Sequence, residues 1–183
     1  MNPTLIAILV VAVLVIIGVA VMVMRSRERE RLQKRFGPEY ERQVEAAGGS
    51  HLKAETELLK REKRVQKLEL RPLPPPERQA FADDWRDVQA RFVDDPERSI
   101  ALADALVGEV MKARGYPVED FDQRAADISV EHPGLVENYR AAHEIARRHA
   151  RGDGDTEDLR AAFIGYRSLF EELLRGDAAE LAH

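Results

Sequence analysis

The chain has 183 residues, a formal net charge of −5 and no cysteine, which excludes a disulfide scaffold, thiolate chemistry and cysteine-based metal centres. Apolar residues make up 44% of it and are concentrated near the N-terminus. A wholly soluble protein is therefore not expected, and a multi-span membrane protein is excluded because no second apolar run approaches the required length.

Residues 5–24 are predicted to form an uncleaved transmembrane helix, preceded by a short extracytoplasmic N-terminus, residues 1–4. All but Gly18 are apolar, and 14 of the 20 are Leu, Ile or Val. Twenty helical residues rise about 30 Å, the thickness of a hydrocarbon core. A cleaved signal peptide is disfavoured, because no basic side chain precedes the run and no small-residue cleavage pattern follows it.

The residues that follow this segment predict its orientation. Lys and Arg next to a membrane helix favour the cytoplasmic side, so the N-terminus is expected outside and the bulk of the chain in the cytoplasm. The basic flank would also contact membrane lipid. The alternative places the C-terminal part outside the cytoplasm. The flanking residues are Arg25, Arg27, Arg29, Arg31, Lys34 and Arg35.

Residues 25–71 are expected to form a basic helical spacer with 14 basic and 9 acidic side chains. Gly37-Pro38 interrupts it. Around this break, Phe36, Tyr40, Val44 and Ala47 share one face. Phe36 and Tyr40 could lie at the lipid headgroups or pack on a neighbouring helix. Residues 52–70 form a charged helix candidate whose heptads are too few for a coiled coil, and residues 65–70 are the one possible strand.

A proline-rich segment, residues 72–76, is predicted to be a stiff hinge, with a ligand for a proline-binding module as the alternative. An all-α bundle is predicted beyond it, over residues 77–175, with a tail at 176–183. Apolar spacing and capping residues place its helices at about 77–93, 96–114, 118–128, 134–150 and 156–175, the last capped by Thr156.

Large aromatic side chains recur at inward-facing spacings on the first and last helices of this bundle. They predict that these two helices pack together with Trp85 buried. The residues are Trp85, Phe92, Phe163, Tyr166 and Phe170.

No catalytic, cofactor-binding or metal-binding residue is predicted. The acidic run 153–158 lacks the Gly and Glu of a calcium loop and is better explained as a loop and a helix cap. His143 and His149 lie six residues apart, a spacing that does not place two ligands on one helix face.

The least ordinary stretch is residues 115–127, where aromatic and acidic side chains alternate. It could dock a partner, although a helix connection with its aromatics in the core is the favoured interpretation. The candidate docking residues are Tyr116, Glu119, Asp120, Phe121 and Asp122.

Several stretches resemble an uncharacterised family of bacterial single-span membrane proteins. They include RFGPEYERQV from Arg35, RPLPPPER from Arg71, WRDVQARFVDDP from Trp85, and RGYPVEDFDQRAADISVEHP from Arg114. The resemblance implies a membrane-anchored helical protein and assigns no activity, ligand or site residue.

Together these features predict a membrane-tethered helical interaction or scaffolding module, not an enzyme, with an unknown protein partner. Residues 72–183 carry 14 basic and 24 acidic side chains, which argues against nucleic acid as a partner. The alternative is a small-molecule-binding or regulatory domain at the cell envelope. An apolar pocket with converging polar groups would favour the alternative, and an exposed aromatic patch would favour the interaction module.

Overall fold

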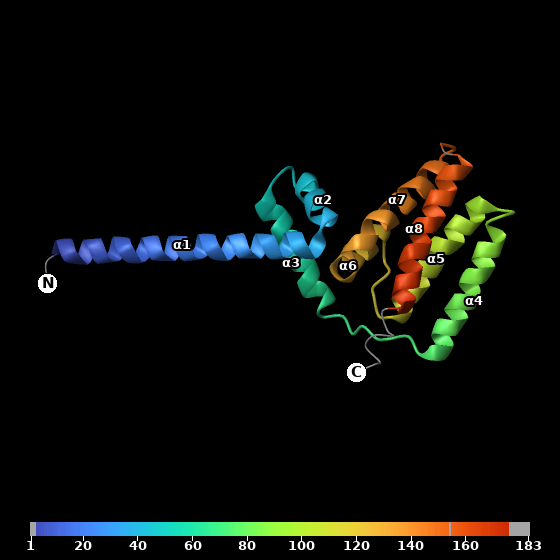
Figure 1. Cartoon of the computed structure of the whole chain (residues 1–183), viewed down its shortest axis with the longest axis horizontal. Coiled ribbons are helices and arrows are strands. Elements are labelled where there is room, and N and C mark those ends of the chain that lie inside the picture. The colour runs from blue at the N-terminus through green and yellow to red at the C-terminus, as the bar shows by residue number, and fades with distance from the viewer. Residues whose placement is uncertain (1–2, 154, 176–183) are drawn as a thin grey trace. The chain divides into compact units, whose positions relative to one another are not determined.

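The protein is all-helical over residues 3–153 and 155–175, the parts that the computed structural model describes, with side chains described from residue 11. The described residues contain no strand, so the strand considered at 65–70 is absent. The predicted tail at 176–183 lies outside these ranges. The helices, labelled in Figure 1, are α1 (Pro3–Phe36), α2 (Pro38–Ala46), α3 (His51–Val65), α4 (Pro75–Arg91), α5 (Pro96–Ala113), α6 (Phe121–Glu131), α7 (Pro133–Ala150) and α8 (Thr156–Arg175).

The chain divides into two compact units, Met1–Leu58 and Leu59–His183. In the first, Gly37 ends α1 with a φ of 50°, and Pro38 takes the first position of α2, as predicted. Phe36 and Tyr40 are fully buried, and the Tyr40 hydroxyl donates to Glu55 Oε1 at 3.1 Å. The face that carries Phe36 and Tyr40 therefore packs on protein.

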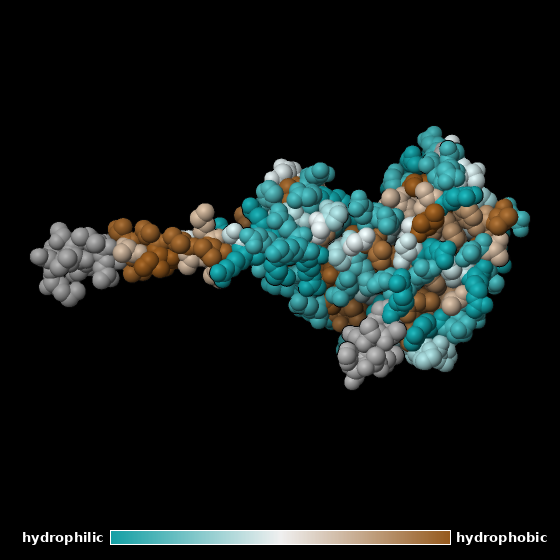
Figure 2. All heavy atoms as spheres, in the orientation of Figure 1, coloured by the Kyte–Doolittle hydropathy of each residue, from teal (hydrophilic) through white to brown (hydrophobic). Residues whose placement is uncertain are grey.

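Residues 11–24 of α1 carry apolar side chains on the surface of the helix. Residues 11–24 are all exposed, and Figure 2 shows them as a brown stretch of the helix. Among the described residues, no helix has both the length and the apolar character required to cross a membrane. Met1, Asn2 and the side chains of residues 5–10 lie outside the described part, and the transmembrane segment stays a prediction.

The second unit is a helical bundle (Figure 1). α8 packs against α5 and α7, α4 packs against α5, and α6 against α7. Its core joins apolar residues from α4 to α8, and Leu73 from the preceding segment is also fully buried in it. The α-helical bundle predicted from the sequence is thus confirmed.

The predicted contact between the first and last bundle helices is also confirmed. The Trp85 ring on α4 stacks on two rings of α8, with centroids 5.2 Å from Phe163 and 4.5 Å from Phe170. The ring centroids of Phe92 and Phe163 lie 4.6 Å apart. Trp85 is 5% exposed, which makes it a core residue.

The helix starts follow from capping chemistry, with two corrections. Asp95 and Pro96 begin α5 as predicted, and Asp95 Oδ1 accepts from Arg98 N at 3.1 Å. α6 starts later than the predicted residue 118, because Asp120 caps it by accepting from Gln123 N. Thr156 was the wrong cap for α8: Asp155 Oδ1 accepts from Asp158 N at 2.8 Å, and Thr156 is already helical.

The proline-rich segment, predicted to be a stiff hinge, is in contact with the bundle. Pro75 and Pro76 lie in the first turn of α4, where the missing N–H groups have no helical partner to lose. Leu73 is fully buried, and Arg71 N donates to Arg114 O at 2.9 Å. The segment is therefore held against the bundle just before α4 begins.

A buried ion pair joins the end of α3 to the same bundle. Asp127 on α6 is fully buried, and its carboxylate accepts from Arg64 Nε at 2.8 Å and from Gln123 Nε2 at 2.8 Å. A buried carboxylate requires such partners. The bundle unit therefore begins before residue 77, the start predicted from the sequence.

We expect a fragment of residues 59–175 to unfold at a clearly higher temperature than one of residues 77–175. The shorter fragment lacks Leu73, a buried leucine whose loss costs about 2–5 kcal/mol, and it also lacks Arg64, the cation that pairs with the buried Asp127 carboxylate. Thermal melts followed by far-UV circular dichroism measure the difference. Equal melting temperatures would contradict the assignment of residues 59–76 to the bundle.

α7 and α8 approach each other closely at Gly165. A Cβ placed there would lie 2.8 Å from Asn138 O and 3.0 Å from Ala142 Cβ, both shorter than normal contact. Gly134 provides a matched control, because a Cβ at that helical position meets no atom within 4 Å.

Gly165→Ala should therefore destabilise the protein by about 1–3 kcal/mol, in spite of the better helix propensity of alanine. Gly134→Ala should be neutral or stabilise by up to about 1 kcal/mol. Urea unfolding of both variants measures these changes. A Gly165→Ala variant as stable as the wild type would show that the two helices separate without cost.

Candidate functional site

The structure separates the two residue types of the predicted docking stretch. Tyr116 is 3% exposed and belongs to the bundle core, while Phe121 is half-buried with its ring centroid 4.9 Å from that of Tyr139. Glu119, Asp120 and Asp122 are exposed. The aromatics therefore serve packing, as the favoured interpretation held, and the acids remain at the surface.

The basic residues after the predicted membrane segment are all exposed on α1. Arg29 Nε lies 2.7 Å from Glu55 Oε1, and Arg31 Nη2 lies 2.7 Å from Glu28 Oε1. Their predicted role in membrane orientation remains a prediction.

A pocket of about 340 Å³ lies within the bundle, lined by residues of α5, α7 and α8; we call it the α5–α7 pocket. Ile100, Leu159 and three alanines on α5 and α7 contribute apolar lining. Its volume lies within the range of small-molecule sites. Its polar lining residues are Glu97, Asp104, His143, Arg147, His149 and Tyr166.

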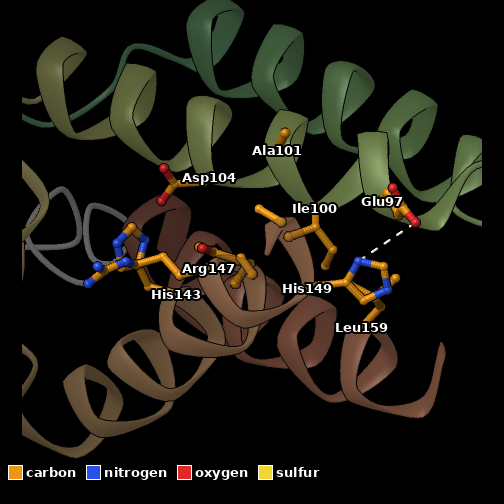
Figure 3. A pocket seen from close by; sticks show the side chains of 11 residues that line it. Glu97, Ile100, Ala101, Asp104, His143, Arg147, His149 and Leu159 are labelled. Carbon is orange, nitrogen blue, oxygen red and sulfur yellow. Dashed lines mark ion pairs between the residues drawn. The ribbon is translucent and has the colours of Figure 1, made fainter. Parts of the chain in front are cut away.

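Polar groups gather at two ends of this pocket. Figure 3 shows Asp104 and His143 at one end, and Glu97 and His149 at the other. His149 Nδ1 lies 3.6 Å from Glu97 Oε1. The pocket therefore offers hydrogen-bonding groups at both ends of an apolar middle.

Asp104 is the centre of the first end. Its Oδ2 accepts from Arg124 Nη2 at 3.2 Å, and its Oδ1 accepts from the Tyr139 hydroxyl at 3.4 Å. Burial, and then the Asp104 charge, raise the pKa of Tyr139 well above its usual value, so its hydroxyl stays protonated. The Asp104 charge is thus compensated by Arg124 inside the protein.

Tyr166 is the second hydroxyl near this end. The residue is fully buried, and its hydroxyl is among the buried polar atoms that have no hydrogen-bond partner. Burial, followed by the Asp104 charge, raises the pKa of Tyr166, so the hydroxyl is a neutral donor. A buried polar group without a partner is uncommon in a folded protein, and this one lies in the lining of a pocket.

His143 is positioned by stacking. Its ring centroid lies 3.5 Å from that of Phe121, with 6° between the planes. Burial lowers the pKa of His143 below the usual value, which leaves the ring neutral near pH 7, with one nitrogen as donor and the other as acceptor. Sequence reasoning placed His143 and His149 on different faces of their helix, and yet both line this pocket.

Sequence reasoning did not select Asp104 or Glu97. The signal for Asp104 was present, because it follows Ile100 and Ala103 on the apolar stripe of α5 and precedes Val107. A charged residue within such a stripe indicates a buried partner or a site. In the part of the chain that the structure describes, no group of three His, Asp or Glu side chains is placed to hold a metal ion.

Comparisons with protein-family models, with curated proteins and with solved structures found no match to this chain. The site is therefore interpreted from its own geometry.

The buried histidines predict how stability changes with pH. Burial lowers the pKa of both His143 and His132, while an unfolded histidine titrates near pH 6.5. Below that pH the unfolded chain binds protons that the folded chain resists, so stability is lost as the pH falls.

We expect the melting temperature to fall between about pH 7.5 and about pH 5.5, and to fall less in His132→Gln and His143→Gln. Calorimetry at several pH values measures this, and His51→Gln, at an exposed position, is the control. A wild-type melting temperature independent of pH in this window would refute the assignment.

Proposed function

We propose that the chain is a single-pass membrane protein anchored by residues 5–24. The support is that residues 11–24 of α1 are apolar and exposed on all sides, and no described element covers them. A helix that is apolar all round is stable in a protein core or in lipid, and these residues are in no core. The resemblance to a family of bacterial single-span proteins agrees with this topology.

The proposed orientation has the N-terminus outside and the bundle in the cytoplasm, because six basic residues follow the segment and none precedes it. A reporter fused after His183 that is active only outside the cytoplasm should be silent, and a cytoplasmic reporter should be active. A second fusion made after Arg35 removes the bundle and should give the same result. Extracytoplasmic activity in both fusions would reverse the orientation.

For the bundle, we propose non-catalytic binding of a small molecule in the α5–α7 pocket. The observation that carries this proposal is that Tyr166, a residue lining this largely apolar pocket, has a buried hydroxyl without a hydrogen-bond partner. Binding is favoured over catalysis, because in the described residues no hydroxyl or carboxylate is hydrogen-bonded to the His143 ring. A nucleophile and its base are therefore not paired there.

The full chain, solubilised in detergent, should retain a small molecule that native mass spectrometry detects. Ala146→Phe should abolish retention, because residue 146 lines the pocket and a ring there fills it. Ala141→Phe is the matched control, since residue 141 is exposed on the same helix and does not line the pocket. The proposal would be contradicted if the three proteins had the same melting temperature and all retained the molecule equally. It would also be contradicted if none of them retained it.

A second candidate function is the interaction module predicted from the sequence. Its support is the exposure of Glu119, Asp120 and Asp122 on an acidic bundle, which suits a basic protein surface. Glu119→Lys should then reduce the capture of a specific partner in a pull-down, without a change in melting temperature. Asp122 is not changed, because it lies in the first turn of α6 and 3.8 Å from Arg140 Nη1. Asp120 is left in place because it caps α6.

A further inference from the structure

We infer that the ligand of the α5–α7 pocket is a neutral small molecule with an apolar body and one hydroxyl or carboxamide group, held at the Asp104 end. This inference rests on the proposed ligand-binding function and specifies the chemistry of the ligand.

The charges at this end favour a neutral ligand. The Asp104 carboxylate is paired with the Arg124 guanidinium, and these side chains are only 26% and 12% exposed. A cationic group that approached Asp104 would also meet Arg124, and an anionic group would meet Asp104. Arg147, the other cation of the lining, is 62% exposed and lies 3.9 Å from Glu144 Oε2. Either ion would therefore lose its water and meet only charges that already have a partner, which disfavours binding.

The hydrogen-bonding groups favour a head that both accepts and donates. The neutral Tyr166 hydroxyl has no partner and can donate to a ligand oxygen. Asp104 can accept a further hydrogen bond, because a carboxylate oxygen has two lone pairs, and Arg124 and Tyr139 donate to different oxygens. A hydroxyl or carboxamide satisfies both groups with one small head.

The apolar middle favours a compact body. Ile100, Leu159 and Ala146 contribute lining, and the volume of about 340 Å³ is near the lower limit for ligand pockets. The contact between His149 and Glu97 occupies the opposite end. A single ring or short branched chain therefore fits this space better than an extended molecule.

Benzyl alcohol, benzylammonium and benzoate test the inference, because they share one ring and differ in the charge of the head. Each is titrated into the full chain in nanodiscs of zwitterionic lipid, with ring carbons of Tyr and His labelled for NMR. The signals of Tyr166 and His143 report on the pocket itself, so partition of the probes into lipid does not mimic binding. Apparent Kd values are referred to the free aqueous concentration of each probe.

We expect benzyl alcohol to bind with an apparent Kd about fivefold lower than either ion, the scale of one added hydrogen bond. Tyr166→Phe, followed through the His143 signal, should raise the apparent Kd of benzyl alcohol about fivefold, because its head group loses one hydrogen-bond donor. Tyr116→Phe is the control, because it removes a tyrosine hydroxyl that does not line the pocket. Ala146→Phe should abolish the binding of all three.

The outcomes separate the inference from the function on which it rests. Saturable binding with an ion as tight as benzyl alcohol, or an affinity for benzyl alcohol unchanged in Tyr166→Phe, would overturn the ligand class and leave ligand binding intact. No saturable shift of the Tyr166 and His143 signals with any probe would overturn both.

Discussion

The close approach of α7 and α8 at Gly165 is the contact on which the bundle and its pocket both depend. With no Cβ at this position, Ala142 of α7 and the backbone of Asn138 lie directly against α8. Two of the contact residues are followed in the sequence by a residue that lines the pocket: His143 follows Ala142, and Tyr166 follows Gly165. The helix contact therefore fixes the separation of these two side chains, because a packed interface does not deform continuously.

A second constraint extends the bundle toward the N-terminus of its unit. The buried charge of Asp127 requires Arg64, and Gly115, with a φ of +97°, lies so close to the preceding segment that a Cβ would be 2.6 Å from Glu69 O. Residue 115 must be glycine, because it adopts a positive φ and has no room for a Cβ. Residues 64–73 are therefore part of the folded unit, although their charge and proline content are typical of a spacer.

The difference between features set by local chemistry and contacts made only in the folded chain explains how much of the fold could be predicted. Asp95-Pro96 marks a helix start by local chemistry, and the spacing of Trp85, Phe163 and Phe170 marks a buried stripe, so both features were predictable. Leu73 is a lone leucine among prolines, and its burial depends on elements that contact it only in the folded chain. Periodicity within one segment contains no information about such partners.

The candidate site was less predictable for a related reason. The aromatics at 116 and 121 and the acids around them suggested a docking loop, but capping by Asp120 turns the acids outward while packing holds the rings inside. The pocket instead combines Asp104, His143 and Tyr166 from three helices, and no local motif connects residues so far apart in the sequence. The one sequence signal for the pocket was Asp104, a charged residue on an apolar stripe. Only the structure shows that Arg124 is its partner.

The two units differ in how their exposed apolar side chains are distributed. This difference connects the proposed membrane anchor with the proposed ligand. Exposed large apolar side chains in the described part of the bundle unit are isolated, as at Val93 and Ile164, whereas those of α1 are contiguous over residues 11–24. Isolated residues are tolerated in water, but a contiguous apolar surface requires another solvent, which the proposed anchor finds in lipid. A neutral amphiphile is also concentrated by lipid, so a tethered bundle would meet such a ligand at a higher local concentration than a free one.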